Sequence, residues 1–304
     1  MPARITLPCI VERQGGRSIT FQTTMAQTPL IVKLTTERNS YPIEAWVYRA
    51  LGQAGLPVPR VAYYNAKLPR LALPCLVMSK LAGQPIFLCD REPLASQLYE
   101  DVGAMLGRIH AVALPRRRFG LGAFMPNRVN AKATWTGFIE THHTHPAAGR
   151  YLRAHDLLPP VAVAVFEGLS ERVAAHAFGA VLNHGDFGPD HILVHEGRIS
   201  GIIDAGEAFV GPAEYDLAYL ACYITDQQFE AVLHAYPKAP DVPMIYVYMF
   251  LIALHKAARA HRIKQLVRAR HFVDLACHAA QRMMFRAGEQ RSTRSTSDVS
   301  VCVA

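Results

Sequence analysis

The segment 182–204 constrains the fold more than any other part of the sequence. Two apolar, β-prone runs flank the pair Glu196-Gly197, an acidic residue followed by glycine, which favours a tight β-hairpin turn. With this pair at the turn, Asp204 lies opposite position 189 on the other strand. The predicted hairpin therefore returns Asp204 to the loop that carries Asp186.

The open end of this hairpin gathers side chains that suit metal and proton chemistry. Asp186 and Asp204 supply carboxylates, and an imidazole lies close by. Carboxylate oxygens are the preferred ligands of hard divalent cations, and a carboxylate or imidazole can act as a general base. In the alternative interpretation, Asp186 and Asp190 only form turns, His184 is a core residue, and Asp204 caps the next segment.

Composition excludes several classes of protein. The chain has 304 residues, of which 51% are hydrophobic and 18% charged, as in a globular protein. The longest uncharged apolar run, 242–254, is shorter than the ~20 residues of a membrane span, so we expect a buried helix there. The amino end does not resemble a signal peptide, and the six cysteines lack metal or disulfide spacing. These features predict a cytoplasmic protein with reduced thiols.

The formal net charge of +8 makes nucleic acid an alternative partner. Much of the excess is local, in the run 116–118 and in the basic residues of 256–270. Among the basic residues of 256–270 there is no aromatic residue on which a base could stack. This pattern favours a helix face that is exposed to solvent. We therefore expect no nucleic-acid partner.

The chain divides into a β-rich and a helical part, which places it in the α+β class. Residues 1–80 combine short β-prone runs with one helical pattern and predict a small N-terminal lobe. A break at Gly83-Gln84-Pro85 leads into residues 81–285, where helices dominate and a larger C-terminal lobe is predicted. The Ser- and Thr-rich segment 286–304 has little to bury, so we predict a disordered tail. The helical patterns lie at 98–112, 161–177 and 244–285.

Several motifs resemble those of one known family. His184-Gly185-Asp186, then His191, then Ile202-Ile203-Asp204 resemble the catalytic and metal-binding segments of the aminoglycoside phosphotransferase family. In the first lobe, Ile31-Val32-Lys33 is similar to the strand lysine of that family, and Glu44 to its partner on the following helix. The family shares a protein-kinase-like fold with choline kinases and protein kinases. The resemblance therefore implies a bilobal kinase-like fold.

The resemblance also implies a function and roles for these residues. The protein would be a small-molecule kinase that uses ATP and magnesium to phosphorylate a hydroxyl group. Asp186 would orient or accept the proton of the attacking hydroxyl, and His184 would brace its loop. Asp204 would hold magnesium. Lys33 would neutralise phosphate oxygens and be oriented by Glu44.

Further residues are assigned by the same resemblance. Ser18 closes the loop expected to cover the phosphates, and Met78 lies on the strand that approaches the nucleotide-binding linker. Asp216 would anchor the catalytic loop from a later helix. Glu37 is a competing partner for Lys33, only four residues away and in an expected exposed loop.

The sequence departs from the family pattern at three places. His191 stands at the metal-ligand position that is usually asparagine, and imidazole is a softer donor than the oxygen that magnesium prefers. This change makes manganese an alternative metal. Ala205 replaces a bulky residue after Asp204, and the loop 14–18 has only two glycines. A nucleotide-binding pseudokinase or regulatory scaffold without turnover is therefore the alternative function.

The sequence defines the acceptor only by class. We expect a small-molecule hydroxyl substrate, either an aminoglycoside-type antibiotic or a metabolite alcohol or amino-alcohol. An aminoglycoside is polycationic, and the residues after 90 offer acids set among more numerous basic residues. We expect no membrane partner. The sequence leaves open the oligomeric state and the choice between ATP and GTP.

Overall fold

The structure, a computed structural model, divides the chain into two compact units. The first unit comprises Met1–Ala131, Ala180–Gly211 and Tyr223–Ala239, and the second comprises Lys132–Gly179, Pro212–Cys222 and Pro240–Ala304. These units do not test the lobe boundary predicted between residues 80 and 81, which stays a prediction. The described residues are 10–14, 18–35, 40–65, 73–89, 94–116, 118–125, 132–142 and 145–297.

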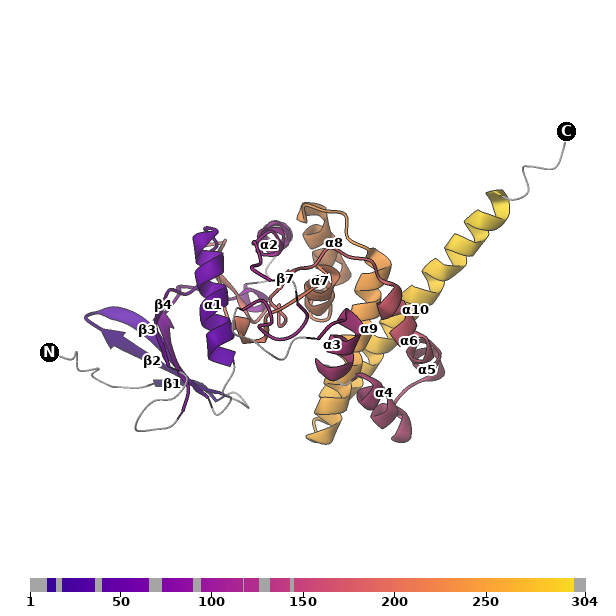
Figure 1. The fold of residues 1–304 in the computed structure, drawn as a ribbon, viewed down its shortest axis with the longest axis horizontal. Coiled ribbons are helices and arrows are strands. Elements are labelled where there is room, and N and C mark those ends of the chain that lie inside the picture. Colours follow the sequence, from indigo (N-terminus) through magenta and orange to yellow (C-terminus); the bar gives the residue numbers. More distant parts are fainter. Residues whose placement is uncertain are drawn as a thin grey trace. The chain divides into compact units, whose positions relative to one another are not determined.

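An antiparallel five-stranded sheet opens the first unit, with the strand order β1-β2-β3-β5-β4 (Figure 1). β3 lies at its centre, bonded to β2 on one side and β5 on the other. Lys33 of β3 pairs with Thr20 and Leu76, so its stem lies in the middle of the sheet. The strands are β1 (Ile10–Gln14), β2 (Ser18–Met25), β3 (Thr28–Thr35), β4 (Val61–Asn65) and β5 (Cys75–Ser79).

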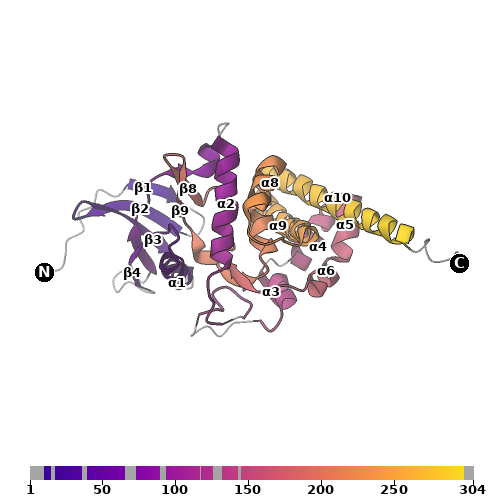
Figure 2. The same cartoon turned by 90° about the horizontal axis from the view of Figure 1, so that it is seen from above.

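Helix α1 (Ser40–Gln53) packs against β4 and β5 of this sheet (Figure 2). The apolar side chains of Ile43, Val47 and Leu51 recur every four residues and are buried, as expected for one face of a helix. The chain leaves the helix at Gly55, whose φ of 70° is the left-handed conformation in which glycine commonly follows a helix. The one helical pattern expected in residues 1–80 is this helix.

The predicted hairpin is present as β8 (Ile192–His195) and β9 (Arg198–Ile202). His195 pairs with Arg198 across the predicted turn. The register then shifts by one residue, so Ile192 pairs with Ile202. Asp204 is therefore in line with Asp190, whereas the sequence predicted position 189. The prediction was wrong by one position because β9 contains one residue, Ser200, that has no pairing partner on β8. The hydroxyl of Ser200 instead donates to the carbonyl of Ala82 at 2.6 Å.

Short elements and two helices complete the first unit. Helix α2 packs along α8, and its last residue, His110, forms a buried hydrogen bond of 2.7 Å through Nδ1 with the hydroxyl of Tyr236, the residue after α8. Strand β6 adds to the hairpin, and β7 pairs with β10. The elements are β6 (Gln84–Pro85), a 3-10 helix (Ile86–Leu88), α2 (Leu94–His110), β7 (Val181–Asn183), a 3-10 helix (Ala205–Glu207), β10 (Phe209–Gly211) and α8 (Asp226–Ala235).

The second unit is helical. Trp135 lies at its centre: its indole N–H donates to the Tyr248 hydroxyl at 2.9 Å, and its ring contacts Phe138 and Tyr215. The predicted helical pattern 161–177 forms two helices because Gly168 ends α5. The described helices are α3 (Trp135–His142), α4 (His145–Ala154), α5 (Pro160–Glu167), α6 (Leu169–Ala175), α7 (Glu214–Ala221), α9 (Val242–Arg262) and α10 (Leu266–Ser297).

The backbone of α10 runs to Ser297, into the segment 286–304 that the composition predicts to be a disordered tail. That segment is therefore helical as far as Ser297, and residues 298–304 lie outside the described residues. In the part of the chain that is described, none of the helices combines the length and the apolar character that a membrane span requires.

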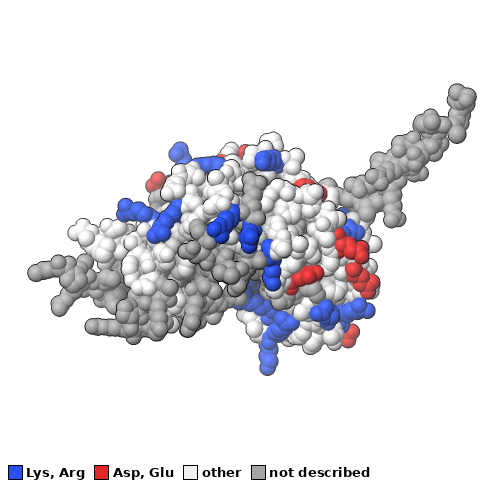
Figure 3. All heavy atoms as spheres, in the orientation of Figure 1, with Lys and Arg blue, Asp and Glu red and all other residues white. Residues whose placement is uncertain are grey.

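Charged side chains are mixed on the face drawn in Figure 3. Basic residues are spread over many elements, and acidic residues lie among those of the second unit. The face drawn in Figure 3 therefore carries side chains of both signs.

Candidate active site

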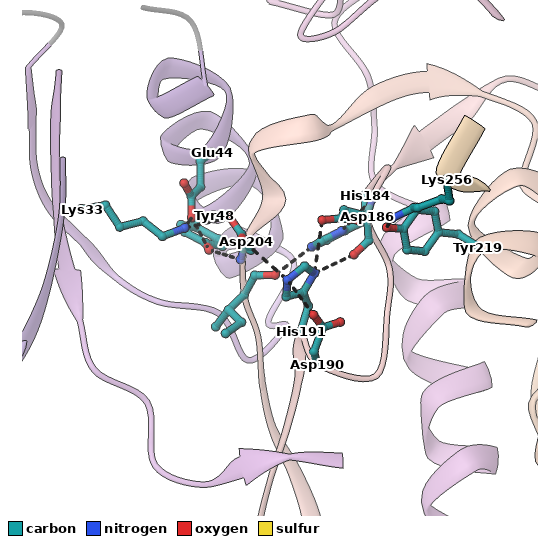
Figure 4. A network of polar contacts seen from close by, with 11 residues as sticks. Lys33, Glu44, Tyr48, His184, Asp186, Asp190, His191, Asp204, Tyr219 and Lys256 are labelled. Carbon is teal, nitrogen blue, oxygen red and sulfur yellow. Dashed lines mark hydrogen bonds and ion pairs between the residues drawn. The ribbon is translucent and has the colours of Figure 1, made fainter. Parts of the chain in front are cut away.

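Four residues of the first unit form a closed ring of hydrogen bonds (Figure 4). The ammonium of Lys33 donates to Glu44 Oε1 at 2.7 Å and to Asp204 Oδ1 at 2.8 Å. The hydroxyl of Tyr48 donates to the same Glu44 oxygen at 2.7 Å and accepts the backbone N–H of Asp204 at 2.8 Å. The ring joins β3, α1 and the segment after β9. The predicted contact between Lys33 and Glu44 is confirmed.

Burial and charge act together in this ring. Burial alone would lower the pKa of Lys33, but the carboxylates of Glu44 and Asp204 raise it above its ordinary value. Burial raises the pKa of Glu44, against the opposing charge of Lys33. The charge of Lys33 holds the pKa of Asp204 well below its ordinary range, against the effect of burial. Lys33 and Asp204 are therefore charged at neutral pH.

Asp204 has the geometry of a ligand rather than of a core residue. Its side chain is 49% exposed, whereas that of Glu44 is 1% exposed. Its backbone lies in the left-handed region, with φ of 64° and ψ of 45°. Aspartate tolerates this conformation better than most residues, but it is uncommon outside turns and functional sites. The carboxylate can therefore meet a ligand from solvent.

The loop that carries Asp186 is fixed through its main chain. His184 Nδ1 accepts the backbone N–H of Asp186 at 3.3 Å, and the Asp186 carbonyl accepts the N–H of Gly188 at 2.8 Å. The side chain of Asp186 is 31% exposed. Fixed backbone atoms and an accessible carboxylate are what a positioned general base requires. The predicted bracing role of His184 fits this geometry.

His184 also connects the two predicted acids. Its other ring nitrogen, Nε2, lies 3.0 Å from the carbonyl oxygen of Ile203, the residue before Asp204. A carbonyl can only accept, so Nε2 carries the proton and Nδ1 is the acceptor. One buried imidazole therefore bonds to the backbone next to Asp204 and to the backbone of Asp186.

Gly185 is required at its position for two reasons. Its φ is +84°, and a Cβ placed on it would lie 2.2 Å from the backbone carbonyl oxygen of Glu207. Gly197 in the hairpin turn has a similar φ of +73°, but a Cβ there would meet nothing within 4 Å. The two glycines share a backbone conformation and differ in the space around them.

We expect alanine at these two positions to separate the cost of the left-handed backbone conformation from the cost of steric overlap with Glu207. Gly197→Ala should cost only the left-handed conformation, about 1–2 kcal/mol of unfolding free energy. Gly185→Ala should cost more than about 3 kcal/mol, because the backbone at Glu207 must also move. Urea denaturation of both variants measures the difference. Equal losses of unfolding free energy in the two variants would show that the close approach to Glu207 does not contribute to the cost.

His191, the predicted metal ligand, is bound to the same loop. Its Nδ1 donates to the Asp186 carbonyl at 2.7 Å, and its Nε2 lies 3.5 Å from Asp204 Oδ2 and 3.6 Å from Asp190 Oδ2. Burial alone would lower the pKa of His191, but the carboxylates of Asp204, Asp186 and Asp190 raise it. Nε2 therefore faces the carboxylates of Asp204 and Asp190, at a position where a cation could lie.

The side chains of Asp204 and His191 fit a cation that takes most of its ligands from the nucleotide and from water. Among the described residues, His, Cys, Asp and Glu side chains form no group of three or more that could hold a metal ion by themselves. Magnesium at nucleotide sites is commonly bound by one or two carboxylates together with phosphates and water. Asp204, with Nε2 of His191 beside it, matches that smaller protein contribution.

Other predicted residues lie elsewhere in the structure. Met78 is buried in β5 and pairs with Ile31. Ser18 begins β2, opposite Thr35, but its side chain lies outside the described residues, as do residues 15–17 of the predicted phosphate loop. The nucleotide roles of Ser18 and Met78 stay predictions. Two more predicted residues are Glu37, which lies outside the described residues, and Asp216, which is buried in α7 of the second unit.

The sequence analysis assigned no role to Tyr48. Tyr48 lies four residues after Glu44, so both side chains share one face of α1. That spacing was the available signal for the contact with Glu44. The contact with the backbone of Asp204 had no signal in the sequence.

The chain matches one family of known proteins. The sequence model described as the phosphotransferase enzyme family matches residues 10–248. Among curated proteins, the chain is 26% identical over 252 residues to hygromycin-B 4-O-kinase of Escherichia coli, covering 79% of this chain and 71% of that protein.

Solved structures show the same fold. A thermostable mutant of aminoglycoside phosphotransferase APH(4)-Ia, in ternary complex with ADP and hygromycin B, matches with a TM-score of 0.73 at 20% identity, covering 90% of this chain and 93% of that chain. The gentamicin complex of APH(2")-IIa matches with a TM-score of 0.64 at 18% identity, covering 90% and 91%. The predicted α+β, protein-kinase-like fold and the resemblance to the family are confirmed.

Proposed function

Because the chain belongs to the phosphotransferase enzyme family, we propose that it moves the γ-phosphate of ATP to a hydroxyl group of an aminoglycoside-type antibiotic. The observation that carries this proposal is the hydrogen-bonded connection from Lys33 through Asp204 and His184 to Asp186. It places a buried cation, a half-exposed carboxylate and an accessible base in one unit. Phosphoryl transfer needs these parts.

Lys33 would bind the phosphates of the nucleotide. Its ammonium is held by Glu44 at the end of a buried stem and is charged at neutral pH. A fixed cation can neutralise phosphate oxygens in both the bound state and the transition state without reorganising. Glu44 would orient Lys33, and Ser18 and Met78 stay the proposed further contacts of the nucleotide.

Asp186 would act on the acceptor. Its backbone is fixed on both sides and its carboxylate is accessible, so it can orient the attacking hydroxyl and take its proton. Positioning of the hydroxyl and acceptance of its proton would both depend on this carboxylate. His184 would keep Asp186 and Asp204 at a fixed separation.

Asp204 and His191 would hold the divalent cation that accompanies the nucleotide, with magnesium as the expected metal and manganese as the alternative. The cation would supply positive charge next to the transferred phosphoryl group. The side chains would supply its position. Asp204, which follows β9, would contribute an oxygen, and His191, which precedes β8, would contribute a nitrogen.

The acceptor class is proposed from the relatives. The curated relative is named as a hygromycin-B kinase, and the two solved structures hold hygromycin B or gentamicin. A screen for ATP consumption against aminoglycosides, macrolides, choline, homoserine and sugars tests this proposal. Turnover with an aminoglycoside would support it. Turnover only with another alcohol would overturn the acceptor class, and nucleotide binding without any turnover would favour the scaffold alternative.

We place the enzyme in the cytoplasm, because its proposed phosphate donor, ATP, is a cytoplasmic metabolite. Measurement of the native protein in cell fractions tests this placement. Recovery outside the cytoplasmic fraction would contradict it.

We expect the His191→Asn variant to keep or raise activity supported by magnesium and to lose any preference for manganese. The amide supplies an oxygen donor, which magnesium prefers, in place of the imidazole nitrogen. Titration of both metals into wild type and variant measures the preference. Inactivity with every metal would instead show that the bond from His191 to the Asp186 carbonyl is required.

A further inference from the structure

The peptide group between Ile203 and Asp204 is held at both of its polar atoms. Its carbonyl oxygen, on Ile203, lies 3.0 Å from His184 Nε2, and its N–H, on Asp204, donates to the Tyr48 hydroxyl at 2.8 Å. The two side chains come from the catalytic loop and from α1. This peptide therefore connects the loop of Asp186 to the helix that carries Glu44.

The Tyr48 hydroxyl is suited to this contact. Tyr48 is 2% exposed, and burial raises its pKa well above the ordinary value, so the hydroxyl keeps its proton. A neutral phenol can donate one hydrogen bond while accepting another. Tyr48 donates to Glu44 and accepts from Asp204, so both capacities are used.

The contact acts on a residue whose backbone is under strain. Asp204 is in the left-handed region, which costs a non-glycine residue free energy unless its surroundings hold it. Its side chain contacts Lys33 at 2.8 Å, but that contact cannot persist unchanged when Lys33 turns to phosphates and Asp204 turns to a cation. The hydrogen bond from Tyr48 is to the backbone, so it can remain during this exchange.

We propose that Tyr48 is a positioning residue that holds the backbone of Asp204 in its left-handed conformation and thereby aims the carboxylate at the cation. The proposal rests on the proposed function and adds to it a residue from α1. It implies that the position of α1 and the orientation of the metal-binding aspartate are coupled through one hydroxyl group.

The same helix offers a matched control. Tyr41 is also 2% exposed, and its hydroxyl has no hydrogen-bond partner among the described residues. Tyr48→Phe and Tyr41→Phe therefore delete the same atom from two buried tyrosines of α1. Only the first deletion removes hydrogen bonds to Glu44 and Asp204.

The first measurement is hydrogen exchange at the Asp204 amide, read as a ratio to exchange at the amides of β5. In Tyr48→Phe we expect this ratio to rise at least about tenfold, because the amide loses its acceptor. In Tyr41→Phe the ratio should stay at the wild-type value. An unchanged ratio in Tyr48→Phe, which includes an equal rise of the exchange rates at Asp204 and at β5, would overturn the proposal.

The second measurement is the concentration of magnesium that supports half-maximal turnover. Loss of residues that orient a metal ligand typically weakens metal binding or activity by about 10–100-fold, and we expect an increase within this range for Tyr48→Phe. The KM of the acceptor should not change. An increase shared by Tyr41→Phe would overturn the proposal. The exchange ratio needs no turnover, so it decides the role of Tyr48 even where the proposed function fails.

Discussion

The Asp186→Asn variant is expected to lose kcat by about 10²–10⁴-fold, the usual contribution of a positioned general base. The amide is nearly isosteric with the carboxylate but cannot take a proton from the attacking hydroxyl. The contacts that fix the loop run through the backbone of Asp186 and would be kept, so fold and nucleotide affinity should stay close to wild type. Steady-state kinetics and a nucleotide titration measure both effects.

The neighbouring carboxylate provides the control for charge. Asp190→Asn removes one negative charge from the same loop, where its side chain is 42% exposed and lies 3.6 Å from His191. We expect a loss of less than about tenfold, because this carboxylate is assigned no proton transfer. Near-normal turnover in Asp186→Asn, or equal losses in both variants, would remove Asp186 from its proposed role.

The second large effect is expected when Lys33 is removed from its buried partner. Lys33→Met leaves the carboxylate of Glu44, which is 1% exposed, without its cation. Breaking a buried ion pair in this way typically costs about 3–5 kcal/mol of unfolding free energy. Turnover should be lost as well, because no other described residue is proposed to bind the phosphates in its place. Denaturation at neutral pH and the kinetic assay check the two parts separately.

The double variant Lys33→Met/Glu44→Gln separates stability from function. A neutral amide needs no cation, so most of the lost stability should return while turnover stays lost. Failure to regain stability would show that the loss came from packing of the Lys33 stem and not from the unpaired charge.

The pH dependence of stability follows from the same pair. Burial raises the pKa of Glu44, so the folded state keeps this proton at a higher pH than the unfolded state does. In Lys33→Met the opposing cation is gone, and the stability of the variant should fall as pH rises above the ordinary pKa of glutamate, because the unfolded state releases the proton first. The double variant lacks this carboxyl group and should not show the fall.

The sequence predicted those parts of the fold that depend on neighbouring residues. The turn Glu196-Gly197 determined the hairpin, because an acidic residue and glycine accept the positive φ values, 50° and 73°, that the turn requires. The bulge in β9 escaped prediction because it depends on a bond from Ser200 to Ala82, 118 positions away. Local patterns carry no information about such a contact.

The candidate site shows the same division. The contact between Lys33 and Glu44 was predicted from a family resemblance. The contact between Tyr48 and Asp204 joins residues 156 positions apart and uses a backbone N–H, which has no sequence signature. For His191, the substitution itself was visible, but its bond to the Asp186 carbonyl appeared only in the folded chain.

Transfer of the terminal phosphate of ATP to an acceptor hydroxyl is the central claim, and it can be observed directly. The purified chain is incubated with ATP labelled in its γ-phosphate, magnesium and hygromycin B or gentamicin, and the antibiotic is then separated and analysed for label and added mass. We expect one phosphate on the antibiotic with wild type and about 10²–10⁴-fold less per unit time with Asp186→Asn. Label that stays in ATP or appears only as inorganic phosphate, with each antibiotic unmodified, would contradict the proposal.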